Sequence, residues 1–106
     1  MPDKVDEVLA EARNLLGKSG ELWYRSLGYR SPQSSPHHNC VLSAIWNTVF
    51  HQAVRWTDKP FELFDLACMR FKSKNGISDI PQWNDVPTRK FADVDYAFRV
   101  ARGEVM

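Results

Sequence analysis

The stretch Asn39-Cys-Val-Leu-Ser-Ala-Ile-Trp-Asn-Thr-Val-Phe-His-Gln-Ala-Val-Arg55 decides the fold of this chain. Its apolar residues recur with the 3.6-residue rhythm of a helix and cover more than half of the helix circumference. The polar residues four apart form one narrow stripe: Ser43, Asn47, His51 and Arg55. Because several neighbours are needed to cover so wide an apolar face, the sequence predicts a central helix of a small bundle over residues 39–55.

A helix is also predicted before this stretch, over residues 4–16. Asp3 is a good N-cap for it, and acidic residues in its first turn favour the helix dipole. Gly17 or Gly20 ends it, because glycine adopts the left-handed conformation at little cost.

A third helix is predicted after Trp56, with Pro60 in its first turn, where proline is tolerated because its missing N–H has no partner there. Thr57 or Asp58 is the expected cap. Basic residues ahead of Asn75-Gly76 are typical of its C-terminal end. One face of this helix is expected to carry a set of apolar side chains: Phe61, Phe64, Cys68 and Phe71.

Two irregular segments are expected between the helices. Residues 21–39 contain a turn-rich Ser31–Pro36 tract, and residues 77–88 contain two prolines that argue against regular helix. The last helix is predicted over residues 89–102. The fold class is therefore all-α: a bundle of about four helices with a long irregular loop between the first and second, forming one domain over residues 1–106.

Composition narrows the possible functions. The chain has 106 residues, 14 basic and 13 acidic, and a net charge of +1, whereas dedicated nucleic-acid binders are usually strongly basic. No secretory signal is visible, and no apolar run approaches the ~18 residues of a membrane span. Two cysteines in apolar helical contexts indicate reduced thiols, so we expect a cytoplasmic protein.

The most reactive-looking cluster is His37-His38-Asn39-Cys40. A thiol at a helix N-terminus has its thiolate stabilised, and His37 or His38 could act as a base, which together would indicate a cysteine nucleophile. The competing interpretation is that Asn39 caps the helix and Cys40 packs as a small apolar residue. Zinc needs four ligands, and the chain offers few others, so we expect no metal and no cofactor.

The segment Trp83-Asn84-Asp85 lies between two prolines. The structural interpretation has Trp83 anchoring the segment in the core, Asn84 and Asp85 making turns or caps, and Pro87 ending it. The alternative is a ligand-facing carboxylate. Candidate binding residues are therefore drawn from this segment and from the long loop: Trp23, Arg25, Tyr29, Arg30, Asn84 and Asp85.

Basic residues at neighbouring element ends could form a local patch for nucleic acid, with a tryptophan stacking on bases. They are Arg70, Lys72, Lys74, Arg89 and Lys90, with Arg25 and Arg30. Overall neutrality makes this an alternative rather than the first choice. An exposed cluster of Trp23, Trp56 or Tyr29 would instead indicate a homodimer face.

The chain resembles a family of small actinobacterial and actinophage proteins of unassigned function. Cys40-Val41-Leu42-Ser43-Ala44 is similar to its helix-opening segment, and its Ile-x-x-Trp-Asn-Asp-x-Pro motif is matched by Ile80, Trp83, Asn84, Asp85 and Pro87, followed by Arg89 and Asp93-Val94. Thr88 and Lys90 depart from the family pattern, which suggests a final helix capped by Asp85 or Thr88. The resemblance implies a compact helical fold and a phage or actinobacterial source, but no chemistry.

The sequence carries no complete catalytic set. We therefore expect a non-enzymatic binding protein of the bacterial cytoplasm, such as a phage accessory protein that engages a host protein. The alternatives are a thiol-dependent enzyme or ligand-binding protein using Cys40 with His37 or His38, and a weak nucleic-acid binder.

Overall fold

The computed structural model describes residues 4–23, 39–52 and 57–105, and all structural statements concern these residues. This part of the chain is helical, with no strand beyond an isolated bridge between Trp23 and Asn39. The elements are α1 (Lys4–Asn14), α2 (Val41–Asn47), the π-helix η1 (Thr48–Gln52), α3 (Pro60–Asn75), α4 (Ile80–Asn84) and α5 (Phe91–Ala101). The predicted all-α class is confirmed, with one short helix more than expected.

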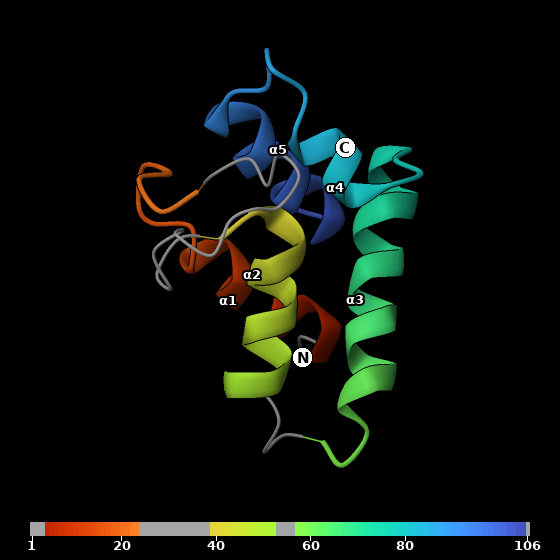
Figure 1. Cartoon of the computed structure of the whole chain (residues 1–106). Helices are drawn as coiled ribbons and strands as arrows, with labels where there is room; N and C mark the ends of the chain where they lie inside the picture. Colours follow the sequence, from red (N-terminus) through yellow and green to blue (C-terminus); the bar gives the residue numbers. More distant parts are fainter. Residues whose placement is uncertain (1–3, 24–38, 53–56, 106) are drawn as a thin grey trace.

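The helices enclose a single core. Figure 1 shows α2 and α3 running alongside each other, and α3 also packs against α1 and α5. Helix α2 contacts α1, α3 and α4. Each helix contributes fully buried side chains, among them Leu9, Val41, Ile45, Phe71 and Phe98. The predicted apolar face of α3 is only partly correct, because its buried residues are Leu63, Ala67, Cys68 and Phe71, whereas Phe61 is exposed.

Helix α1 follows the predicted stripe, since Val5, Val8, Leu9 and Ala12 are buried. It ends at Asn14, two residues earlier than predicted. The amide of Gly17 then donates to the carbonyl of Asn14 over 3.1 Å, which tightens the final turn. Gly17 and Gly20 both have positive φ, as the glycine signal predicts.

The central helix differs from the prediction at both ends. Its N-cap is Cys40, not Asn39: the Cys40 sulfur accepts from the Ser43 amide over 3.4 Å, and the Ser43 hydroxyl accepts from the Cys40 amide over 2.9 Å. Asn39 is buried, and its side-chain oxygen instead accepts from Asn47 over 2.7 Å. From Thr48 the helix continues as a π turn, and its predicted end at Arg55 lies outside the described residues.

Thr48 sits at this junction and gives a testable prediction. It is fully buried, and its hydroxyl has no hydrogen-bond partner in the part of the chain described. Burying an unpaired hydroxyl destabilises a fold. We expect Thr48→Val, which keeps the shape, to raise the free energy of unfolding by about 1 kcal/mol in urea melts. Thr48→Ser, which keeps the hydroxyl and removes a methyl group, should lower it. A fall in stability with valine would show that the hydroxyl is paired.

Helix α3 begins at Pro60, which lies in the first turn as predicted, but the prediction that Thr57 or Asp58 caps it is wrong: Lys59 is the N-cap and makes no side-chain cap bond. The Thr57 hydroxyl, which was expected to cap the helix, instead accepts from the Lys59 amide over 3.0 Å and so stabilises the turn ahead of the helix. The helix ends at Gly76, with φ of 66° and its amide bonded to the Lys72 carbonyl, as the Asn-Gly signal predicts.

The prediction that residues 77–88 hold no regular helix is wrong, because Ile80–Asn84 form α4. Pro81 falls in its first turn, where no amide donor is needed, and Asp79 accepts from the Gln82 amide over 2.8 Å. Helix α5 begins at Phe91, with Lys90 as its N-cap. Asp93 accepts from the Lys90 amide, so neither Asp85 nor Thr88 caps this helix.

Candidate interaction groove

The Trp83-Asn84-Asp85 segment makes contacts within the fold. Asn84 is fully buried, and its side-chain oxygen accepts from the Trp23 indole over 2.8 Å and from the Val41 amide over 3.0 Å. Its side-chain nitrogen donates to Asp85 over 3.0 Å. The Asn84 side chain, from α4, therefore links Trp23 to Val41, the first residue of α2. We name these contacts the Asn84 clamp.

Trp83 is held from both sides. Its ring lies edge-on to Phe71, with centroids 5.7 Å apart, and the Arg89 guanidinium stacks 4.1 Å from its centroid. Arg89 also donates from Nε to the Trp83 carbonyl over 3.0 Å. Trp83 and Arg89 thus contribute to the packing around α4.

The structure separates the predicted binding residues. Trp23, Asn84 and Asp85 meet at the clamp, where each bonds within the fold. Arg25 and Tyr29 lie outside the described residues, as do Arg30, His37, His38 and Trp56. Ligand binding by any of these residues stays a prediction.

Both thiols are buried. Cys40 caps α2, and Cys68 lies on α3, where burial raises the pKa of its thiol to about 12. The Cys68 thiol is therefore protonated at neutral pH and is a poor nucleophile. Among the described residues, the histidine is His51, exposed on η1 at the opposite end of the central helix.

The thiol-dependent alternative can be tested by reactivity. We expect Cys68 in the folded protein to resist Ellman's reagent and to react only on unfolding, because its thiol is buried and protonated. The Cys68→Ser variant then reports Cys40 alone. Cys40→Ser is the matched control, because serine also caps helices. A Cys40 that reacts faster than free cysteine in the folded protein would restore the enzyme alternative.

An apolar groove opens between α2 and α3. A hollow of about 430 Å³ is lined by Leu42, Trp46 and Phe64, with Cys40 and Ser43 at its edge. A second hollow of about 380 Å³ shares Leu42 and Phe64 and continues to Ile80 and Pro81 of α4. We call the two together the α2–α3 groove.

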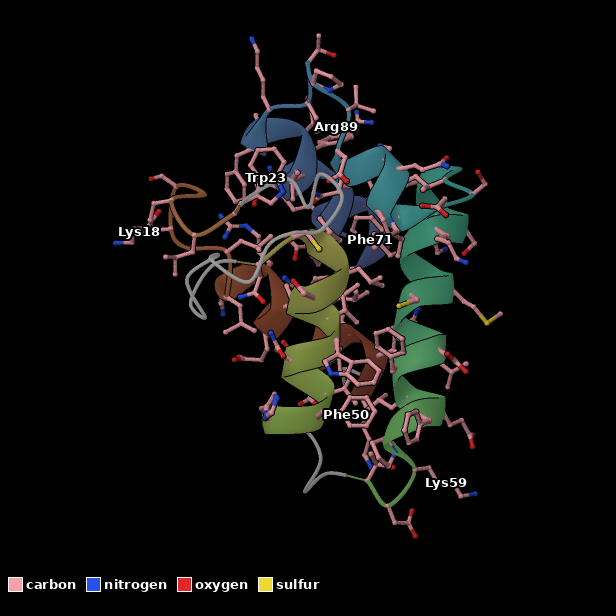
Figure 2. The ribbon with its side chains drawn as sticks, in the orientation of Figure 1. Lys18, Trp23, Phe50, Lys59, Phe71 and Arg89 are labelled. Atoms are coloured by element: carbon pink, nitrogen blue, oxygen red, sulfur yellow. The ribbon has the colours of Figure 1, made fainter. Side chains whose placement is uncertain are left out.

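Aromatic rings fill the other end of this groove, where Figure 2 places Phe50 between the two helices. Trp46 stacks on Phe50 with centroids 4.2 Å apart, and Phe61 lies edge-on to Phe50 at 5.0 Å. Phe64 lies edge-on to Trp46 at 5.1 Å. The cluster is not sealed: Trp46 is 40% and Phe61 67% exposed.

The π turn contributes to this arrangement. Residues four apart drift around an α-helix, but a π turn takes more residues per turn, so Phe50 stays on the face of Trp46. Leu42, Trp46 and Phe50 thus form one wall, opposite Phe61 and Phe64 of α3.

Sequence reasoning missed this groove. It expected neighbouring helices to cover the whole apolar face of the central helix, which includes Trp46 and Phe50, and it placed Phe61 on one face with the buried Phe71, whereas Phe61 is mostly exposed. The unusually wide apolar face of the central helix was the sequence feature that could have predicted the groove. The described helices cover only part of that face.

The basic residues that were predicted to form a patch lie in different surroundings. Lys72 lines the groove near Asp65 and Asp79, Arg89 stacks on Trp83, and Lys90 caps α5. Arg25 and Arg30 lie outside the described residues. Nucleic-acid binding stays a prediction with no added support.

Comparison with known proteins gives one match, to a family model described as a family of unknown function, DUF6197, over residues 1–104. The chain belongs to the DUF6197 family. Among curated proteins and solved structures, no significant match is found. Membership of a family of unassigned function agrees with the resemblance seen in the sequence. The actinobacterial or phage source and the Ile-x-x-Trp-Asn-Asp-x-Pro motif of that family stay predictions.

DUF6197 membership assigns no chemistry, so the site must be judged on its geometry. The described chain gathers no group of three or more His, Cys, Asp or Glu side chains in a metal-binding arrangement. Within the same residues, no helix combines the length and hydropathy that a membrane crossing demands. The described chain also has a hollow of about 520 Å³ beside Trp83 and Arg89 and one of about 270 Å³ between α1 and α3, but the hollow beside Trp46 has the most apolar lining.

Proposed function

We propose that this DUF6197 protein is a non-enzymatic interaction protein that binds a protein partner through the α2–α3 groove. The observation that carries the proposal is the open aromatic cluster of Trp46, Phe50, Phe61 and Phe64. Aromatic side chains are enriched in protein interfaces and at their energetic centres. A contiguous exposed apolar patch on a folded domain marks an interaction site more often than isolated apolar residues do.

The polarity of the groove supports binding over catalysis. The hollow beside Trp46 is lined almost wholly by carbon and sulfur, with the Ser43 hydroxyl bonded to the Cys40 backbone. The charged groups near the groove are Asp65, Lys72 and Asp79, at its α3–α4 side, and the thiols of Cys40 and Cys68 also line it. Asp79 is used as the cap of α4. A cytoplasmic setting and a phage accessory role, which the sequence predicts, belong to this proposal.

A capture experiment with matched variants tests it. Tagged full-length protein is incubated with actinobacterial lysate, and stoichiometric partners are compared between wild type and Phe61→Ser, which changes a mostly exposed ring. Met69→Ser is the control, because Met69 is 59% exposed on α3 but neither lines the two hollows nor belongs to the aromatic cluster that Phe61 joins at their end. We expect one partner retained by the control and lost by Phe61→Ser. No stoichiometric partner, or one retained equally by both variants, would contradict the proposal.

Self-association is a second use of the same surface. Sedimentation of the wild type over a range of concentrations would reveal a dimer, and Phe61→Ser should abolish it if the groove is the interface. A dimer that Phe61→Ser leaves intact would place the homodimer face elsewhere.

A further inference from the structure

We propose that the α2–α3 groove binds an amphipathic α-helix that carries a basic residue opposite Asp65; this inference rests on the proposed function and names the kind of partner. Three properties of the groove carry it: the spacing of its walls, the absence of free backbone groups along them, and its charge.

The walls are two helices with regularly spaced apolar side chains. Leu42, Trp46 and Phe50 stand four residues apart, while Phe61 and Phe64 face them from α3. A helix presents apolar side chains at i, i+3, i+4 and i+7, which matches such walls. A docked helix would therefore lie along the groove as one more member of the bundle.

Backbone chemistry selects against an extended peptide. A strand that joins a partner needs exposed amides and carbonyls to pair with, as at a sheet edge. Along the groove, the backbone groups of α2 and α3 are used within their own helices. A bound segment must therefore satisfy its own backbone, and a helix does so.

The charge beside the groove indicates the charge that a partner should carry. Asp65 is exposed at the α3 side of the groove and makes no ion pair within the part of the chain described. The part of the groove next to α4 is lined by two carboxylates, Asp65 and Asp79, and by one ammonium group, Lys72. The uncompensated charge beside the apolar surface is thus negative, which favours a lysine or arginine on the partner and disfavours an anionic membrane surface.

Matched peptides test the inference. Two labelled peptides of about 18 residues, long enough to form helix in isolation, carry leucines at the same positions and either lysines or glutamates on the flanks. Fluorescence anisotropy measures their binding to the full-length protein. We expect the lysine peptide to bind wild type about fivefold more tightly than the glutamate peptide, since an exposed charge pair contributes up to about 1 kcal/mol.

Two variants then separate charge from apolar contact. Asp65→Lys should reverse the order of the two peptides, and Phe61→Ser should weaken both, whereas Met69→Ser should change neither. Equal binding of the two peptides, no binding of either, or an order unchanged in Asp65→Lys would overturn the inference. Binding to phosphatidylglycerol vesicles in place of the peptides would also overturn it.

The two proposals fail in different experiments. If the peptides do not discriminate but Phe61→Ser still loses a captured partner, the helical partner is wrong and the interaction function stands. If Phe61→Ser loses no partner, the proposed function itself is wrong.

Discussion

Replacing Asn84 with alanine is expected to lower the free energy of unfolding by about 3 kcal/mol. Asn84 is fully buried, and its oxygen accepts from both the Trp23 indole and the Val41 amide. Alanine removes the acceptor of the buried Val41 amide and of the half-buried Trp23 indole, and an unpaired buried donor costs about 1–3 kcal/mol. Urea denaturation followed by circular dichroism measures the loss.

Gln82→Ala is the control for this change. Gln82 lies on the same short helix but is exposed, so its substitution should alter stability by less than about 0.5 kcal/mol. A double-mutant cycle sharpens the result, because Trp23→Phe removes the indole donor and keeps a ring. Asn84→Ala should then cost about 1 kcal/mol less in the Trp23→Phe background than in wild type. Strict additivity would show that the Trp23–Asn84 bond contributes nothing.

Replacing Gly20 with alanine is expected to cost roughly 3–4 kcal/mol, from left-handed strain plus overpacking. Gly20 has φ of 80°, and an added Cβ would lie 2.6 Å from the Cδ atoms of Phe91. The ring cannot readily move away, because the Arg13 guanidinium stacks 4.7 Å from its centroid and Trp23 packs against it at 6.2 Å.

Gly103→Ala separates the cost of left-handed backbone strain from the cost of overpacking. Gly103 has the same φ of 80°, but no atom lies within 4 Å of the position of an added Cβ. The free energy of unfolding of Gly103→Ala should fall only by the cost of the left-handed backbone conformation, about 1 kcal/mol. Equal losses for the two variants, measured by thermal and urea unfolding, would contradict the close contact between the turn and Phe91.

Local signals predicted most of the helices. The apolar stripe of α1, Pro60 in the first turn of α3 and the glycine at its end each follow from properties of neighbouring residues. Pro81 misled the prediction because proline both breaks helices and begins them. Which applies depends on whether a capping residue stands just ahead of the proline, and Asp79, two residues before Pro81, supplies the cap that starts α4.

Tertiary contacts explain what the sequence did not show. Asn39 has the chemistry of an N-cap, yet its side chain bonds to Asn47, and the cap passes to Cys40. Trp46 fits the core rhythm of the central helix, but α3 covers only part of its ring. Whether an apolar residue is enclosed depends on how far a neighbouring helix reaches, and spacing along one helix does not encode that distance.

Nuclear magnetic resonance can show whether the α2–α3 groove is the surface that binds the partner. The full-length protein labelled with ¹⁵N is titrated with the lysine-flanked peptide, and the tryptophan indole signals are followed. We expect the Trp46 indole signal to shift, together with the amide signals of Leu42, Phe61 and Asp65, while the indole signals of Trp23 and Trp83 stay in place. Shifts centred on Trp83, or none in the groove at saturating peptide, would contradict it.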